Sequence, residues 1–273
     1  MTSLSPRANE TESMHVGVFD SGIGGLSVLR AVRESMPYAV LSYFADSAHA
    51  PYGERADGHV LERSHKVAKH LIDQGAKVLV LACNTATAIA IDRLRARWPA
   101  LPMVGVEPGL KPAVALSRTR RVAVMATPAT LRSDRFERLA QTHAGTAFVH
   151  RIPCPGLAAL IEGGDLAHPR LLELLAEHCA SIKRFEVDVV VLGCTHYSFV
   201  RDGIERLLGP GVTVIDTAQA VANQVVRLSG PMRARTSMPI SLRLMTSGDA
   251  TSLRTVASGW LDVSCQVEAC PSV

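Results

Sequence analysis

The sequence predicts an α/β protein built from two similar open parallel-sheet halves, with a functional site in the cleft between them. Apolar runs typical of strands alternate with helical runs along the 273 residues, a pattern that indicates parallel βαβ units. Two of these runs, 78–85 (VLVLACNT) and 189–196 (VVVLGCTH), carry a cysteine at the strand's end and lead into a helical run. The order of elements around them occurs twice, which indicates an internal duplication.

The first half is expected to contain four strands, each followed by a helical run. These strands are placed at 15–20, 40–45, 78–81 and 103–106. They are short, apolar and bounded by turn residues, which is typical of strands buried on both faces of a sheet. The longest helix is expected over about 56–74, after a loop that contains Pro51, Tyr52 and Gly53.

The second half repeats this order. Its strands are placed at 121–126, 146–151, 189–192 and 212–216, and its longest helix at 169–184. A last strand at 240–245 and a helix from about 250 to 261 are expected to return to the first half. The strand carboxyl ends of the two halves should then face each other, because open α/β sheets bind their ligands at that edge.

The predicted boundaries lie near 100 and 211. Residues 1–15 are expected to form a disordered leader, and 231–239 a linker. Residues 16–100 together with 211–265 are expected to form the first α/β domain, and 101–210 the second.

Composition argues for an ordinary soluble protein. The chain is 47% hydrophobic with a mean hydropathy of +0.16, and its apolar runs are too short to cross a membrane. The polar leader lacks the hydrophobic region of a signal peptide, so a cytoplasmic location is expected. A net charge of +4 and 4% aromatic residues provide no stacking surface for nucleic acid, so no nucleic-acid partner is expected.

Six cysteines occur, but only Cys83 and Cys194 lie at positions that suggest a function. No CxxC pair is present, and a cytosolic chain keeps its thiols reduced. Cys179 is expected in a helical core, Cys154 in a loop, and Cys265 and Cys270 in an irregular tail.

Several roles are open to a cysteine pair. His196 could serve as a base for a nucleophilic Cys194, but that role leaves Cys83 unexplained. Metal binding would require further ligands, which neighbours such as Asn84 and Thr85 supply poorly. Two thiols suit best a reaction that removes a proton from one face of a carbon and returns one to the other. Each thiol is expected to begin a helix, whose N-terminal field should lower its pKa.

The turn after the first strand, with Asp20, Ser21 and three glycines, could belong to the same site. Asp20 could orient a thiol proton or simply cap the following helix. A dinucleotide site is disfavoured because the GxGxxG pattern fails at Ser27 and the Asp20 carboxylate would repel a pyrophosphate. Free backbone N–H groups here, with the side chains of Asn84, Thr85 and Thr195, suit a carboxylate better.

Five segments resemble the signature segments of glutamate racemase, a family of the cofactor-independent aspartate/glutamate racemase superfamily. They are DSGIGGLSVLR (20–30), ADSAHAPYGER (45–55), ACNTATA (82–88), IEGG (161–164) and GCTHY (193–197). The resemblance runs in order from about 15 to 262. Two departures from the family pattern occur. Phe136 stands where the family usually has Tyr, and Ser198 stands where a Pro often follows the CTHY motif.

The resemblance implies that Cys83 acts on D-glutamate and Cys194 on L-glutamate, with help from Asp20, His196 and Glu162. It implies these substrate contacts: Asp20, Ser21, Tyr52, Gly53, Asn84, Thr85, Thr195 and His196, with Thr127 and Thr130 as weaker candidates. Two of these roles have plain alternatives, since His196 could be a core or capping histidine and Glu162 a surface carboxylate at a helix end.

The resemblance also implies a reaction without metal, pyridoxal phosphate or nucleotide. The expected partners are the small-molecule substrate L- or D-glutamate and a second copy of the chain in a homodimer, with no membrane involved. D-Glutamate from such an enzyme would supply peptidoglycan synthesis. The alternatives are an aspartate or other amino-acid racemase, and a catalytically silent small-molecule binding protein on the same scaffold.

Overall fold

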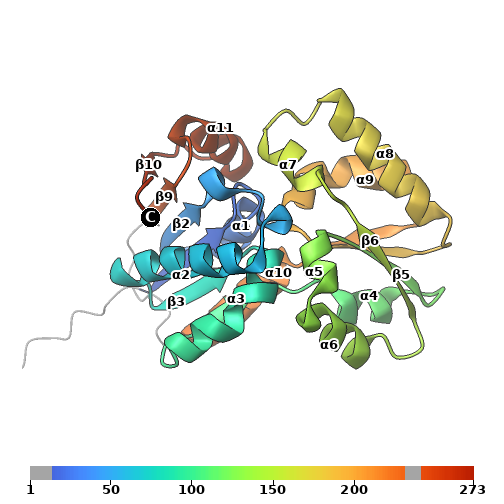
Figure 1. The fold of residues 1–273 in the computed structure, drawn as a ribbon, viewed down its shortest axis with the longest axis horizontal. Helices are drawn as coiled ribbons and strands as arrows, with labels where there is room; N and C mark the ends of the chain where they lie inside the picture. The colour runs from blue at the N-terminus through green and yellow to red at the C-terminus, as the bar shows by residue number, and fades with distance from the viewer. Residues whose placement is uncertain (1–13, 231–240) are drawn as a thin grey trace, which may run out of the picture.

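The computed structural model describes residues 14–230 and 241–273, and shows two parallel sheets side by side, each covered by helices (Figure 1). The first sheet has the strand order β10-β9-β2-β1-β3-β4. Its strands are β1 (His15–Asp20), β2 (Val40–Ala45), β3 (Val78–Leu81), β4 (Met103–Gly105), β9 (Ser241–Thr246) and β10 (Val267–Ala269). We call this sheet and its helices the first half.

The second half is built on a sheet with the order β6-β5-β7-β8. Its strands are β5 (Arg121–Ala126), β6 (Phe148–Pro153), β7 (Val189–Leu192) and β8 (Thr213–Ile215). The order β2-β1-β3-β4 of the first sheet is the same arrangement, with β3 in the place of β7. The predicted class of two open parallel-sheet α/β halves is therefore confirmed, and Cys83 and Cys194 follow equivalent strands.

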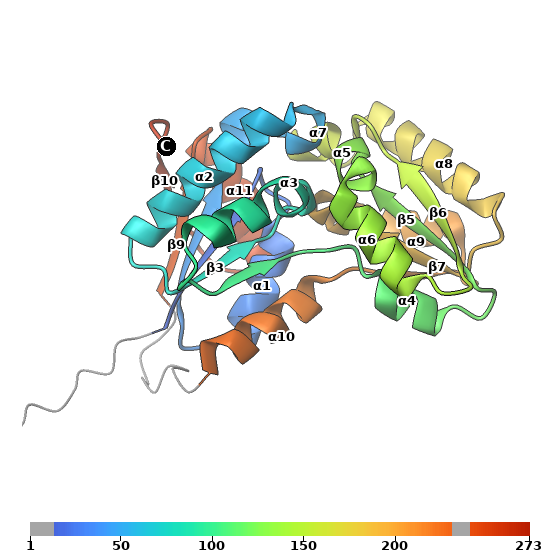
Figure 2. The same cartoon turned by 60° about the horizontal axis from the view of Figure 1, so that its bottom comes forward.

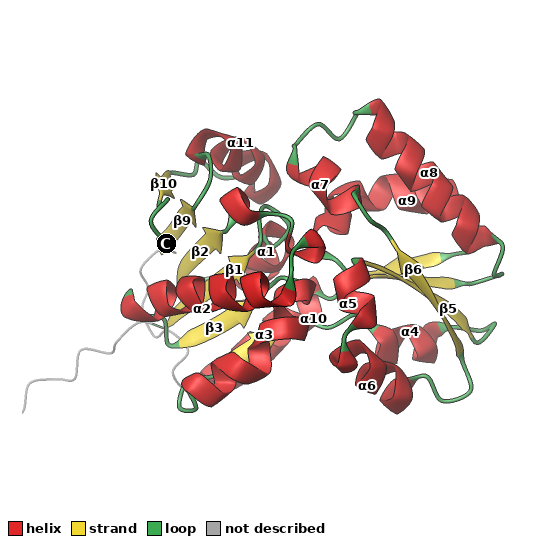
Figure 3. Cartoon of the chain, in the orientation of Figure 1, coloured by secondary structure: helices red, strands yellow, loops and turns green. Residues whose placement is uncertain are grey.

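Helices cover both faces of each sheet (Figures 2 and 3). The first half carries α1 (Leu26–Ser35), α2 (Asp57–Asp73), α3 (Asn84–Arg97), α10 (Ala218–Ser229) and α11 (Ala250–Leu261). The second carries α4 (Leu110–Leu116), α5 (Pro128–Arg132), α6 (Asp134–His143), α7 (Leu157–Glu162), α8 (Pro169–Lys183) and α9 (Arg201–Leu208). Apolar side chains fill the space on each face, so all residues of β3 and β7 are buried as predicted.

Strand pairing corrects the two predicted boundaries. Leu79 of β3 pairs with Met103 of β4, so 103–105 belongs to the first sheet, as its place in the first set of strands implied, and the first boundary lies after 105 rather than near 100. Val189 of β7 pairs with Thr213 of β8, so 213–215 belongs to the second sheet. Both strands are the last of their sets, and hydrogen bonding to the previous strand decides their sheet, which hydrophobic periodicity alone does not reveal.

The ends of the described chain also differ from expectation. Met14 is buried and His15 begins β1, so 14 and 15 are not part of a leader. Cys265 and Cys270 are buried beside β10, which pairs with β9, so this segment is not an irregular tail. Residues 1–13 of the predicted leader and the predicted linker 231–239 lie outside the described residues.

The edge strand β6 begins two residues later than predicted, at 148 rather than 146. Only Ile152 of its six residues is buried, and the other five are exposed or half-buried. An edge strand that is covered on few sides carries little of the apolar pattern from which strand limits are predicted.

Asp188, just before β7, fastens the α4–β5 connection to the second sheet. Its carboxylate accepts hydrogen bonds from the hydroxyls of Ser117 (2.6 Å) and Thr119 (2.9 Å) and from the backbone N–H groups of Arg118 and Thr119. Burial alone would raise the pKa of Asp188, but these four donors outweigh burial and lower the pKa to about 2.

We expect Asp188 to make the stability of the fold pH-dependent. A carboxyl whose pKa is lower in the folded state stabilises the fold above its unfolded pKa, and the benefit disappears as the pH falls toward the folded pKa. This benefit is about 2 kcal/mol and should be lost between about pH 4 and pH 2. Urea unfolding of Asp188→Asn should show a comparable loss at neutral pH and a weaker acid dependence. The exposed Asp73→Asn is the control, and equal stability of Asp188→Asn and wild type would contradict this assignment.

Candidate active site

The predicted site residues come together where the strand ends of the two halves meet. Asp20 ends β1 of the first half, and Thr195 follows β7 of the second. The Thr195 hydroxyl donates to Asp20 Oδ2 across the junction at 3.0 Å. Nearby, the hydroxyl oxygens of Thr85 and Thr127, again from opposite halves, lie 3.0 Å apart. The facing strand ends are thus joined by direct polar contacts.

Cys83 caps the amino end of α3. Its Sγ accepts a hydrogen bond from the Ala86 N–H at 3.4 Å and donates to Ser21 Oγ at 3.7 Å. The expectation of a lowered pKa is wrong for this thiol. Burial and the neighbouring charge of Asp20 raise the pKa of Cys83 to about 12, because together they outweigh the hydrogen bond from the helix terminus.

Cys194 has a different environment. It precedes η3 (Thr195–Val200), a short 3₁₀ helix, rather than the α-helix that the sequence predicted. Its Sγ lies 3.9 Å from His196 Nδ1, and His196 Nε2 lies 2.7 Å from Glu162 Oε2. Cys194, His196 and Glu162 therefore form a continuous chain of contacts within the second half.

His196 and Glu162 are neither an isolated core histidine nor a surface carboxylate. The His196 side chain is 2% exposed and that of Glu162 15%. Glu162 also accepts from the Ile23 N–H (2.9 Å) and the Ser47 hydroxyl (2.8 Å) of the first half. Burial alone lowers the pKa of His196, but its contacts with Cys194 and Glu162 hold the pKa well above the usual value.

Asp20 is fully buried and accepts three hydrogen bonds. Besides Thr195, its donors are the Gly22 N–H at 3.0 Å and the Ser21 hydroxyl at 3.4 Å. Burial raises the pKa of Asp20, although the nearby His196 acts in the opposite direction. Asp20 does not cap α1, because the residue before that helix is Gly25 and no side chain bonds its first turn.

Among the predicted substrate contacts, Asn84 is the one with unused bonding capacity. Its side chain is buried, and Oδ1 has no hydrogen-bond partner among the described residues. Asn84 lines a small cavity at the junction of the halves, together with Ser27, Cys194 and Thr195. A buried polar atom without a partner is costly, so Oδ1 is suited to receive a donor from a ligand.

Tyr52 and Gly53, two further predicted substrate contacts, lie in a first-half loop that packs against Thr127 of the second half. Tyr52 is fully buried and its hydroxyl donates to Asp46 at 2.6 Å, so the hydrogen of that hydroxyl already has a partner within the first half. Gly53 lies against Thr127 so closely that a Cβ at Gly53 would be 2.6 Å from Thr127 Cγ2. Thr127 and Thr130 bond each other at 3.0 Å and both contact Thr85.

Sequence reasoning missed three supporting groups: Ser47 and the Ile23 N–H, which hold Glu162, and Tyr43, whose hydroxyl donates to the Gly22 carbonyl at 2.6 Å. Tyr43 lies inside a predicted strand and Ser47 in a loop, so neither had a signal besides its residue type. The two departures from the family pattern lie elsewhere: Phe136 is buried in the second-half core, and Ser198 lies in η3.

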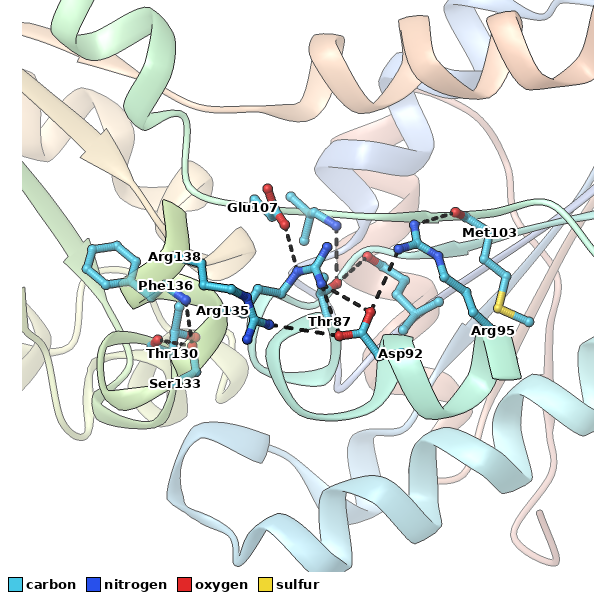
Figure 4. A network of polar contacts seen from close by, with 12 residues as sticks. Thr87, Asp92, Arg95, Met103, Glu107, Thr130, Ser133, Arg135, Phe136 and Arg138 are labelled. Atoms are coloured by element: carbon cyan, nitrogen blue, oxygen red, sulfur yellow. Dashed lines mark hydrogen bonds and ion pairs between the residues drawn. The ribbon is translucent and has the colours of Figure 1, made fainter. Parts of the chain in front are cut away.

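A second set of polar contacts joins the halves on another side of the junction (Figure 4). Arg135 of α6 pairs with Glu107, which follows β4, at 2.6 Å, and with Asp92 of α3 at 3.3 Å. Arg138 and Arg95 also approach Asp92, at 4.0 and 3.9 Å. These contacts help to set how the two strand edges face each other.

Within 14–230 and 241–273, His, Cys, Asp and Glu side chains form no cluster of three or more that could hold a metal ion. No helix in these ranges is both long and apolar enough to span a bilayer.

Comparison with known proteins identifies the class. The model of the Asp/Glu/hydantoin racemase family matches residues 26–225. With the duplicated α/β fold and the paired strand-end thiols, this match places the chain in that class of racemases.

Individual relatives narrow the class. The glutamate racemase of Ralstonia pickettii is 46% identical over 247 residues, which cover 90% of this chain and 87% of the relative. The crystal structure of the glutamate racemase isoform RacE1 from Bacillus anthracis superposes with a TM-score of 0.86 at 27% identity, covering 96% of this chain and 98% of that one. The glutamate racemase of Francisella tularensis, solved in complex with D-glutamate, has a TM-score of 0.82 at 28% identity, covering 94% and 96%. The chain belongs to the glutamate racemase family.

Proposed function

We propose that this chain interconverts L- and D-glutamate by a two-base proton transfer between Cys83 and Cys194 that uses no cofactor. The observation that carries the proposal is the placement of two thiols after equivalent strands of two duplicated halves. Opposed groups of this kind suit the two faces of one α-carbon. The family relationship supports glutamate as the substrate, and the Francisella relative was solved with D-glutamate bound.

In the proposed reaction, Cys194 removes the α-proton of L-glutamate and Cys83 delivers a proton to the opposite face. Cys83 starts the reverse reaction from D-glutamate. Asp20 and Ser21 act on the Cys83 side, and His196 with Glu162 on the Cys194 side, as the contacts of each thiol suggest. Proton transfer to and from such positioned groups is general acid–base catalysis.

The substrate is held by groups at the strand ends. We propose that the Asn84 carbonyl oxygen accepts from the substrate ammonium, because that oxygen is buried without a partner. The hydroxyls of Thr85 and Thr195 and the backbone of Tyr52 and Gly53 would hold the carboxylates. Donors fixed in place before substrate arrives stabilise the developing carbanion without reorganisation during the reaction.

Three wider roles belong to the same proposal. The D-glutamate would supply peptidoglycan synthesis, the reaction would take place in the cytoplasm, and the active form would be a homodimer. The family relationship supports the first two.

Isotope labelling in deuterated water tests the reaction. Starting from L-glutamate, Cys83 should deliver deuterium, so label should appear early in D-glutamate and much more slowly in recovered L-glutamate. Each thiol reaches only one face of the α-carbon and exchanges its single hydrogen with solvent between turnovers. Mass spectrometry after separation of the enantiomers measures both, and L-aspartate is the control substrate. Equal early labelling of substrate and product would contradict two opposed bases.

Removal of metal ions gives an independent test. Activity, followed by polarimetry, should be unchanged after dialysis against a strong chelator, because the proposed bases are thiols and no metal site occurs among the described residues. Loss of activity that zinc restores would contradict the cofactor-free reaction.

A further inference from the structure

The 46–54 loop, which follows β2, carries two of the proposed substrate contacts and reaches across to the second half. Near its start, the Ser47 hydroxyl donates to Glu162 Oε1 at 2.8 Å. At its end, Glu54 Oε1 accepts from the Gly156 N–H at 3.0 Å. Both contacts join the loop to the opposite half, so the position of the loop affects how the proposed site is assembled.

Local structure does little to fix the position of this loop. It consists of two single turns of 3₁₀ helix, η1 (Ser47–His49) and η2 (Tyr52–Glu54). Short 3₁₀ turns have few hydrogen bonds of their own and poor hydrogen-bond geometry. Among the described residues, no side chain caps either turn. Contacts with the rest of the first half must therefore hold the loop in place.

The carboxylate of Asp46, at the start of the loop, supplies such contacts. It is fully buried and accepts from the hydroxyls of Tyr52 (2.6 Å) and Ser247 (2.7 Å). Arg63 of α2 adds two bonds, from Nε to Oδ2 at 2.9 Å and from Nη2 to Oδ1 at 2.7 Å. Burial alone would raise the pKa of Asp46, but the hydrogen bonds from these three residues outweigh burial and lower it.

Arg63 fixes the orientation of this carboxylate. Its side chain is 5% exposed, and its third nitrogen, Nη1, donates to the Val273 carbonyl oxygen at 2.8 Å. A planar guanidinium that makes two parallel bonds sets both the place and the plane of a carboxylate. Because the Tyr52 hydroxyl bonds to the same carboxylate, that plane also determines where Tyr52 lies.

Stability alone is a poor explanation for this ion pair. Taking both charges out of water carries a large desolvation penalty, and apolar residues of similar volume are often at least as stabilising as a buried ion pair. An apolar pair, however, could not bond the hydroxyls of Tyr52 and Ser247. The pair formed by Asp46 and Arg63 therefore fits a role in orienting the loop.

We propose that Arg63 is a positioning residue, which sets through Asp46 and Tyr52 where the 46–54 loop presents its backbone to glutamate. This inference rests on the function proposed above and deepens it, because Arg63 is not among the proposed substrate contacts. The two thiols follow β3 and β7, which the loop does not hold. Loss of Arg63 should therefore weaken substrate binding more than it slows the chemical step.

Steady-state kinetics of the full chain with both enantiomers of glutamate test this role. Arg63→Met should raise KM by about tenfold or more and lower kcat by a smaller factor, because the substrate-binding backbone is displaced. Lys66→Met is the matched control, since it removes the same charge from the same helix at a side chain that is 50% exposed. It should leave KM and kcat unchanged. An unchanged KM in a folded Arg63→Met enzyme overturns the proposal.

Two further variants separate positioning from stability, because Arg63→Met leaves the buried Asp46 charge without its partner and should lower the melting temperature. Arg63→Lys keeps the charge, but one ammonium group cannot make the two parallel bonds, so KM should rise while the melting temperature falls less. The double variant Arg63→Met with Asp46→Asn removes the unpaired charge. It should regain stability without regaining the wild-type KM. A wild-type KM in either variant overturns the role of Arg63.

Failure of this inference is distinct from failure of the proposed function. The deuterium labelling pattern of the wild type and the serine variants of Cys83 and Cys194 test the two-base reaction. The comparison of KM between the wild type and the Arg63 variants tests only the positioning role. Equal KM values beside the expected labelling pattern would overturn that role and leave the two-base reaction in place.

Discussion

Serine in place of either Cys83 or Cys194 is expected to lower the racemisation rate by about a thousandfold or more, within the range of general acid–base effects. A serine hydroxyl is not ionised at neutral pH, so Cys194→Ser cannot remove the proton of L-glutamate. Cys83→Ser cannot remove the proton of D-glutamate. Because each turnover uses both groups in sequence, one substitution should stop both directions. Polarimetry from each enantiomer measures the loss.

The chain offers matched controls for this prediction. Cys154, Cys179, Cys265 and Cys270 are buried thiols like the active pair, but they do not lie at the carboxyl ends of β3 or β7. Their serine variants should keep most of the activity. If Cys194→Ser retained more than about a tenth of the wild-type rate, the two-base assignment would be wrong.

Alanine at Gly24 is expected to have the second-largest effect, a loss of about a hundredfold or more in kcat/KM. A Cβ at this position would lie 2.5 Å from His196 Nδ1 and 2.5 Å from Thr195 Oγ1. Both groups belong to the opposite half of the molecule, so they must move to accept the methyl group. Displacement of a catalytic group by about 1 Å can cost a hundredfold in rate.

Gly58→Ala is the matched control, since a Cβ at Gly58 in α2 would meet nothing within 4 Å. It should leave kcat/KM unchanged. Thermal unfolding of both variants separates a local displacement from a loss of fold. If a folded Gly24→Ala enzyme kept the wild-type kcat/KM, the close approach of the Gly24 turn would not be needed to position His196 and Thr195, and the prediction would be wrong.

Much of the fold could be predicted from local patterns. Strands β1, β2 and β5 were predicted with their observed limits, because each is a continuous apolar run bounded by turn residues. The two domain boundaries were not, because hydrogen bonding between strands, and not the local pattern, decides where one sheet ends and the other begins. The short strand β10, with three residues, carries too little pattern to be recognised.

In the candidate site, likewise, the residues could be identified from the sequence but their contacts could not. Cys83 and Cys194 could be singled out because each follows a buried strand, and the family resemblance indicated Asp20, His196 and Glu162. Their contacts could not be predicted. Ser47 and Ile23 hold Glu162 across more than a hundred residues of sequence, so no local signal connects them.

By itself, the sequence determined the two-half α/β class, the two cysteines and the family, because these depend on residue types and spacings along the chain. Only the tertiary structure decided the electrostatic character of the thiols. A helix terminus suggested a lowered pKa for Cys83, but burial beside Asp20 raises it. The tertiary structure also placed His196 between Cys194 and a buried carboxylate. Burial and charge act through space, so the ionisation of a group depends on neighbours that only folding brings together.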